Sequence, residues 1–190
     1  GLGDVYKRQA IIQMARSFYK VPSDTTAFFC DGILPEQAAY QKGRLLMAAA
    51  EAGANIVSGA GNVDGGMAFS PEQLAIDNEI AGLTKRLLLG FDIDDKSLAL
   101  DCIRRVGPKG NFLEDRHTLE NFRSQALFTP TIFSYQNFST WQQSGKKFME
   151  RAEETVHGTL AVHEVPPLED AVVNELKRIV KAADAEIAGC

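Results

Sequence analysis

Residues 55–77, NIVSGAGNVDGGMAFSPEQLAID, constrain the fold more than any other part of the chain. The apolar run 55–58 predicts a short strand, and a glycine-rich loop follows it. A helix then begins, because Ser70 is suited to cap it, Pro71 fits its first turn and Gln73 completes a capping box. In parallel α/β proteins ligands bind at loops that follow the carboxyl ends of strands, so this loop is the first candidate for a functional site.

A similar strand and helix precede this segment. Residues 25–30 are β-branched and aromatic, which predicts a buried strand that ends at Asp31 and Gly32. A helix is predicted over residues 35–51, with Gly53 as its left-handed stop. Two strands joined through a helix must run parallel, because so long a crossover cannot form a hairpin.

The N-terminal residues fit nothing that follows them. Residues 1–9, GLGDVYKRQ, resemble library adaptor sequence found at the ends of translated environmental reads, so we set them aside from the fold. From Ala10, apolar residues recur at Ile11, Met14 and Phe18, a spacing that predicts a helix of about two turns.

After Gly90 the alternation of strands and helices stops. Helices are predicted over residues 94–106, 117–125, 144–162 and 168–187, whereas residues 127–138 are ambiguous. In the last helix, the residues expected to face inward are Leu176, Ile179, Val180, Ala183 and Ile187. The chain accordingly divides into a strand-bearing part, residues 10–91, and a helical extension, residues 92–190.

Two parallel strands pose a physical difficulty. Parallel strands are buried on both faces and occur in sheets of several strands, so a pair can neither fill a doubly wound sheet nor close a barrel. We therefore expect the chain to be the C-terminal part of a larger α/β domain. The alternative is a mostly helical domain with a small sheet.

Composition excludes several classes of partner. The net charge of −5 argues against nucleic acid or an anionic membrane surface, since both require clustered Lys and Arg. No apolar run is long enough to span a membrane and no signal peptide is recognisable, so we expect a cytoplasmic protein. Cys30, Cys102 and Cys190 lie at scattered positions without zinc-ligand spacing, and we expect neither disulfides nor zinc.

The glycine loop does not match a nucleotide site. Gly59 and Gly61 begin a G-x-G pattern, but Asp64 stands where a third glycine is needed, and its carboxylate would repel a pyrophosphate. The loop can still let a ligand approach the backbone closely, and it presents Asn62 and Asp64. The alternative is that these glycines only turn the chain.

Two aspartates follow the two predicted strands. If the strands are neighbours, Asp31 and Asp64 lie at the same edge, where paired carboxylates suit a cationic ligand or proton transfer. Each could instead stabilise a turn or a helix N-terminus.

Other side chains could complete such a site. Phe28, Phe29 and Met67 lie near the strand ends and could bind an alkylated ammonium by cation–π contact, although aromatic residues there are more often core. His117 is predicted in a polar loop, where it could shuttle protons or contact a large cofactor, or cap a helix.

From about Val21 to its end, the chain resembles the trimethylamine:corrinoid methyltransferase family, which also contains glycine betaine methyltransferases. The order and spacing of the matching segments agree over nearly the whole chain. These segments are CDGILPEQAAYQKG, GNVDGGMAFSPEQLAIDNEI, LALDCIRRVGPKGNFLEDRHTLENFR and VPPLEDAVVNELKRIV.

The resemblance implies the C-terminal part of a TIM (β/α)8 barrel, comprising its last two strands and a helical extension. Members of the family move a methyl group from a tertiary or quaternary amine to the Co(I) corrinoid of a separate corrinoid-binding protein, without zinc. The resemblance is also compatible with a homo-oligomer. By position at the strand ends, Asp31 and Asp64 would act electrostatically, and Phe28 or Phe29, with Asn62 and Met67, would contact the substrate. Gly59 and Gly61 would contact the corrinoid. His117 would act in catalysis, in contact with the corrinoid or the substrate.

One departure from the family pattern concerns pyrrolysine. Trimethylamine enzymes of the family carry it within the barrel at a place that corresponds, by distance from the C-terminus, to residues 29–31. Ordinary residues stand there in this chain. We therefore expect the branch without pyrrolysine, which acts on quaternary amines such as betaines. The alternatives are a non-catalytic module that binds quaternary ammonium and another TIM-barrel enzyme that uses Asp31 and Asp64.

Overall fold

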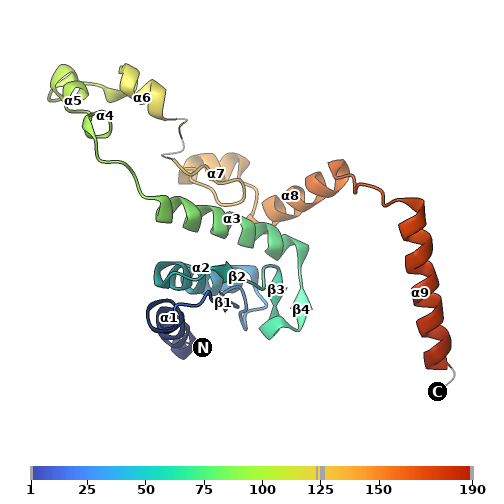
Figure 1. Cartoon of the computed structure of the whole chain (residues 1–190). Helices are drawn as coiled ribbons and strands as arrows, with labels where there is room; N and C mark the ends of the chain where they lie inside the picture. The colour runs from blue at the N-terminus through green and yellow to red at the C-terminus, as the bar shows by residue number, and fades with distance from the viewer. Residues whose placement is uncertain (1, 123, 125–126, 189–190) are drawn as a thin grey trace. The chain divides into compact units, whose positions relative to one another are not determined.

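The computed structural model describes residues 2–122, 124 and 127–188, and within them the chain is mostly helical with two small β-sheets (Figure 1). Two compact units are distinguished, residues 1–157 and 158–190. The elements before Gly90 are α1 (Leu2–Met14), the π-helix η1 (Ala15–Tyr19), β1 (Asp24–Thr25), α2 (Pro35–Ala52), β2 (Ile56–Val57), β3 (Asn62–Val63), the 3-10 turn η2 (Asp64–Gly66), β4 (Ala68–Phe69) and α3 (Pro71–Leu89).

Only helices and turns follow Gly90 among the described residues. They are α4 (Asp95–Leu98), α5 (Leu100–Val106), the 3-10 turn η3 (Phe112–Glu114), α6 (Arg116–Asn121), α7 (Phe138–Ser144), α8 (Phe148–Val162) and α9 (Asp170–Ala188). In the part of the chain that the structure describes, no helix combines the length and apolar composition that crossing a membrane requires.

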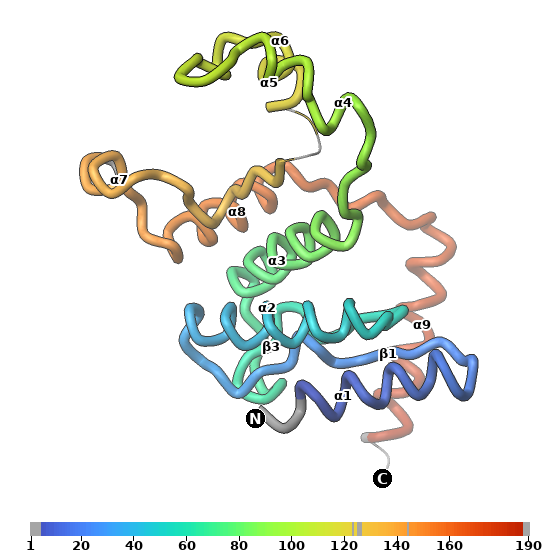
Figure 2. Tube along the Cα trace, turned by 90° about the vertical axis from the view of Figure 1, so that its left-hand side faces the viewer, coloured from blue at the N-terminus to red at the C-terminus, as the bar shows by residue number. Residues whose placement is uncertain are grey.

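The core of the first unit lies on both sides of α2. Figure 2 shows α2 between α1 and α3. One cluster packs α2 against α3 through Leu46, Ile76 and Ile80, and another packs α2 against α1 through Ile12 and Ala49. Leu46 and Ala49 of α2 are thus buried, and Gly53 ends the helix at a φ of 88° as expected.

The predicted parallel pairing is confirmed, but the strands are shorter than expected. β1 and β2 pair in parallel with Asp24 opposite Ile56 and Thr25 opposite Val57. The predicted strand over residues 25–30 was wrong beyond Thr25, because the chain turns there: the N–H of Phe29 donates to the carbonyl of Thr26 at 3.1 Å. The TIM barrel remains a proposal, because the observed fold is only a mostly helical α/β arrangement.

The predicted glycine loop contains an unexpected hairpin. β3 and β4 pair antiparallel, with Asn62 opposite Phe69, and η2 connects them. We call residues 59–69 the glycine hairpin. Each strand has only two residues, which is too short for an alternation of apolar and polar residues to indicate a strand in the sequence.

The start of α3 follows its sequence signals only in part. Pro71 opens the helix, and the Ser70 side chain accepts the N–H of Gln73 at 3.1 Å. The reciprocal half of the capping box was wrong. The N–H of Ser70 donates to the carbonyl of Gly61 at 2.9 Å, so Gln73 is released to donate from Nε2 to Asp77 Oδ1 at 2.8 Å.

The N-terminal helix begins earlier than predicted. It starts at Leu2, and its partly buried stripe, which includes Val5 and Arg8, leads to the buried Ile12. Ile11, Met14 and Phe18 are exposed. The helical face that packs on α2 runs through Val5, Arg8 and Ile12, and the first two belong to residues 1–9, which the prediction had left out. The adaptor origin of residues 1–9 concerns the gene and stays a prediction.

Later helices also depart from their predicted limits. The helix predicted over residues 94–106 is capped by Asp94 but breaks at Ala99, whose φ is 50°. The predicted 144–162 helix is α8, which starts only at Phe148. The helix predicted over residues 117–125 is α6 and ends at Asn121, with Gln125 outside the described residues.

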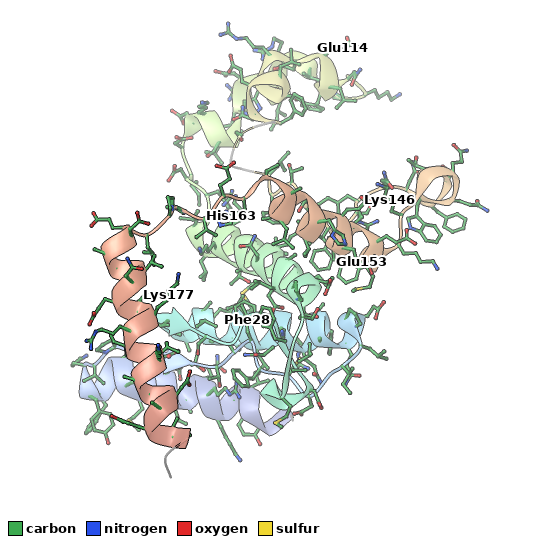
Figure 3. The ribbon with its side chains drawn as sticks, turned by 90° about the vertical axis from the view of Figure 1, so that its right-hand side faces the viewer. Phe28, Glu114, Lys146, Glu153, His163 and Lys177 are labelled. Atoms are coloured by element: carbon green, nitrogen blue, oxygen red, sulfur yellow. The ribbon has the colours of Figure 1, made fainter. Side chains whose placement is uncertain are left out.

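The inward face predicted for the last helix is not buried within the unit that contains it. α9, on which Figure 3 labels Lys177, leaves its apolar stripe exposed. Among the described residues of this unit, 158–188, only the end of α8 could pack on α9, so its amphipathic stripe has no apolar partner there.

A buried carboxylate joins α3 to the irregular segment that precedes α7. Glu79 is 6% exposed and accepts four hydrogen bonds, from the backbone N–H groups of Thr131, Ile132 and Phe133 and from the Thr131 hydroxyl, at 2.6–2.8 Å. Burial alone would raise the pKa of Glu79, but these hydrogen bonds outweigh it and hold the pKa below its usual value. The segment therefore packs as a fixed loop.

We expect Glu79→Gln to lower the free energy of unfolding by about 2–4 kcal/mol, because an amide cannot satisfy all four donors. Since the pKa of Glu79 is lowered on folding, its stabilisation is complete above the unfolded value of about 4.3 and is lost as pH falls through the folded value.

Denaturant unfolding between acid and neutral pH measures both effects. The difference between wild type and Glu79→Gln should shrink in acid. The exposed Glu153→Gln on α8 is the control and should change little at any pH. A pH-independent difference at Glu79 would contradict this interpretation.

Candidate functional site

The turn after β1 meets the glycine hairpin through backbone hydrogen bonds. The N–H of Gly65 donates to the carbonyl of Cys30 at 2.7 Å, and that of Asp64 donates to the carbonyl of Gly32 at 3.5 Å. A Cβ placed on Gly65 would lie 3.9 Å from Oδ1 of Asp31. The structure thus brings Asp31 and Asp64, both exposed, to one acidic rim formed by residues 30–32 and 64–66.

The ring of Phe29 lies between two glycines of the hairpin. A Cβ on Gly59 would overlap one edge of the ring, and a Cβ on Gly66 would overlap the other. Both glycines also have positive φ, of 96° and 89°. Two glycines therefore make a notch that only a backbone without side chains can form, and Phe29 fills it at the rim.

A cavity of about 620 Å³ opens beside this rim. Phe29 and Asp31 line it from the strand end, and Tyr40 and Arg44 line it from α2. The Arg44 guanidinium lies 5.4 Å from the Tyr40 ring centroid and donates to its hydroxyl at 3.4 Å. Arg8 of α1 also lines the cavity, which thus combines two aromatic rings and a carboxylate with two arginine side chains.

A buried ion pair lies beneath the hairpin. Lys42 of α2 and Asp77 of α3 have fully buried side chains, and Nζ lies 2.6 Å from Oδ2. Asp77 Oδ2 also accepts the N–H of Gly61 at 2.8 Å. Burial raises the pKa of Asp77, while the hydrogen bonds from Lys42, Gly61 and Gln73 lower it and so offset part of that effect.

Sequence reasoning missed this pair, although a signal was present. Lys42 stands four residues after Ala38 and four before Leu46, within the stripe that α2 buries, and Asp77 follows the buried Ile76. A charged residue inside an apolar stripe is rarely buried without a partner, so each position indicated that a partner is needed but not which residue supplies it.

The other predicted site residues are dispersed. Phe28, labelled in Figure 3, is 5% exposed and packs in the core with Leu46 and Ile76, away from solvent. Met67 is 86% exposed at the hairpin tip, and Asn62 is half-buried in β3. Phe29 is thus the predicted aromatic residue that lines the cavity.

His117 makes its contacts within the helical segment after Gly90. Its Nε2 lies 3.1 Å from the carbonyl of Lys96, and its backbone N–H donates to Asp115 Oδ1 at 2.9 Å. That bond and the Arg105 guanidinium lower the pKa of Asp115. A role for His117 in catalysis or corrinoid contact stays a prediction.

The glycines predicted to contact a cofactor have internal partners. Gly59 faces Phe29, and a Cβ on Gly61 would overlap the ring of Phe69. The N–H of Gly61 is directed to Asp77, away from any ligand at the rim. Within residues 2–122, 124 and 127–188, no group of three His, Cys, Asp or Glu side chains is placed to hold a metal ion.

We expect Gly66→Ala to lower the free energy of unfolding by about 1–3 kcal/mol, because a methyl group collides with Phe29 at a strained positive φ. Gly158→Ala is the matched control. Gly158 lies inside α8 with open space around its Cβ position, so alanine there should stabilise by about 0.5–1 kcal/mol. Thermal or denaturant unfolding measures the change in the free energy of unfolding of both variants. An equal change in the two would show that Gly66 and Phe29 are not tightly packed.

Comparison with known proteins gives the chain a family. The model of the family described as "Trimethylamine methyltransferase (MTTB)" matches residues 4–188. Trimethylamine methyltransferase MttB2 of Methanosarcina mazei is 34% identical over 179 residues, 92% of this chain and 35% of that relative. Glycine betaine methyltransferase of Desulfitobacterium hafniense is 32% identical over 180 residues, 94% and 37% respectively. The chain spans about a third of the length of these relatives, and it belongs to the trimethylamine methyltransferase (MTTB) family.

Proposed function

We propose that this chain is part of an enzyme that transfers a methyl group from a tertiary or quaternary amine to the corrinoid of a partner protein. The observation that supports this most is the rim where Phe29, Asp31 and Asp64 meet beside a cavity, in a chain of this family. In the whole protein, β1 and β2 would be the last two strands of a TIM barrel, and the rim would lie at its mouth.

The chemistry explains why such a rim is useful. An amine leaves readily only when its nitrogen is positively charged, and it then departs with the electron pair of the broken C–N bond. The carboxylates of Asp31 and Asp64 attract that cation, and the face of Phe29 adds a cation–π contact. Catalysis then depends mainly on holding the methyl group in line with its acceptor.

The corrinoid would approach from the partner protein. When docked, it supplies the low-valent cobalt that accepts the methyl group. The glycine hairpin suits such an approach, because Met67 beside its tip and Phe69 at its base are both exposed. These exposed apolar side chains give a flat macrocycle a surface to contact.

The cavity favours a zwitterionic amine over trimethylamine. Asp31 and Phe29 line one part of it, and Arg44 lies on another wall, where its guanidinium could bind a carboxylate. A betaine carries both groups, a quaternary ammonium and a carboxylate. This agrees with the ordinary residues at positions 29–31, which led us to expect the branch of the family without pyrrolysine.

The transfer reaction can be tested directly with the full-length protein. We expect methylcobalamin to form when the full-length protein is incubated with a corrinoid protein and glycine betaine. The change in the visible absorption of the corrinoid measures this reaction. Methylamines are assayed in parallel. If none of these amines methylates the corrinoid, the transfer reaction is wrong. Tight betaine binding without methyl transfer would instead favour a binding module.

Two substitutions distinguish the residue that binds the ammonium group of the substrate from the residue that binds its carboxylate. We expect Asp31→Asn to weaken binding of both glycine betaine and tetramethylammonium by about five- to tenfold, because the cation loses a carboxylate partner. Arg44→Gln should weaken binding of glycine betaine alone, since tetramethylammonium carries no carboxylate. Titration calorimetry measures both. An equal effect of Arg44→Gln on the two ligands would contradict the assignment of the cavity.

A further inference from the structure

Within the part of the chain that the structure describes, the ion pair between Lys42 and Asp77 is a fully buried polar feature that the proposed reaction does not use. Both side chains are 0% exposed, and the Nζ–Oδ2 distance is 2.6 Å. Asp77 also accepts the N–H of Gly61 and the Nε2 of Gln73, each at 2.8 Å. One carboxylate therefore connects α2, α3 and the root of the glycine hairpin.

Stability alone does not explain such a pair. Removing two charges from water costs about as much as their attraction returns, and well-packed apolar residues in their place are often as stable or more so. What a buried carboxylate does impose is geometry, because it tolerates only arrangements in which its donors stay in place. Gly61 is the one of these donors that belongs to the hairpin.

Gly61 is well placed to transmit that geometry to the rim. Its carbonyl accepts the N–H of Ser70 at 2.9 Å, while its own N–H donates to Asp77. Both backbone polar groups of Gly61 are therefore hydrogen-bonded at the base of the hairpin. β3 starts at the next residue, and Asp64 follows it. The N–H of Gly65 then reaches the carbonyl of Cys30 at 2.7 Å. A shift of Gly61 therefore moves Asp64 relative to Asp31.

We propose that Lys42 and Asp77 are positioning residues whose ion pair fixes Gly61 and thereby holds Asp64 against the turn that carries Asp31. The anchoring of the hairpin follows from these contacts alone. Its consequence for ligand binding rests on the proposed function. The two parts can therefore fail separately.

The test compares two uncharged replacements of the pair in the 190-residue chain. Lys42→Met with Asp77→Leu removes both charges and the acceptor for Gly61. Lys42→Met with Asp77→Asn removes both charges but keeps an oxygen that can accept the N–H of Gly61. Hydrogen exchange followed by mass spectrometry reports separately on α2, on α3 and on residues 61–69.

We expect residues 61–69 to exchange about tenfold faster or more in the Met/Leu variant, because the hydrogen bond to a charged acceptor is lost, while α2 and α3 keep their protection. The Met/Asn variant should recover most of the protection of the hairpin. Glu79→Leu is the matched control, a buried carboxylate lost from the same helix. It should loosen residues 131–133 and leave the hairpin unchanged.

Each outcome decides the proposal. A hairpin that exchanges as in wild type in the Met/Leu variant would overturn it. Simultaneous loss of protection in α2, α3 and the hairpin, including failure to fold, would also overturn it, since the pair would then hold the whole unit.

Titration with glycine betaine tests the functional part. Binding should weaken in the Met/Leu variant and largely recover in the Met/Asn variant. This titration uses the full-length protein. If the wild-type full-length protein binds no betaine, the proposed function fails, while the exchange result still decides whether Lys42 and Asp77 position the hairpin.

Discussion

The buried carboxylate of Asp77 is the interaction on which the arrangement of the first unit depends. It must be neutralised and hydrogen-bonded, and its partners come from α2, from α3 itself and from the hairpin. Glu79 has the same requirement but faces a different segment, because two residues along a helix turn the side chain by about 200°. α3 thus connects the hairpin on one face and residues 131–133 on the other.

The glycines of the hairpin are explained by packing as well as by function. Gly59 and Gly66 leave room for the ring of Phe29, and Gly61 leaves room for Phe69 while it bonds to Asp77. The two explanations are not alternatives. The ring that requires the glycines is also the aromatic wall of the cavity beside Asp31, so close packing at this point places a ring next to a carboxylate.

Local signals predicted the parts of this structure that local chemistry determines. The Ser70 cap, the Gly53 stop and the start of α3 at Pro71 follow from side chains within a few residues of each helix end. The parallel pairing followed from connectivity, and with it the meeting of Asp31 and Asp64. Contacts between distant segments could not be predicted in this way. Residue spacing shows neither which groups bond to Asp77 and Glu79 nor that Phe28 is buried while Phe29 lines the cavity. The stripe on α9 predicted burial, yet burial also needs a surface opposite, which its own unit does not supply.

The central claim is that the rim formed by residues 30–32 and 64–66 binds a quaternary ammonium. A crystal structure of the full-length protein with glycine betaine tests it most directly. We expect the ammonium within about 6 Å of the Phe29 ring, with the Asp31 and Asp64 carboxylates as its nearest charges. A betaine bound elsewhere, with this rim facing away from it, would contradict the claim.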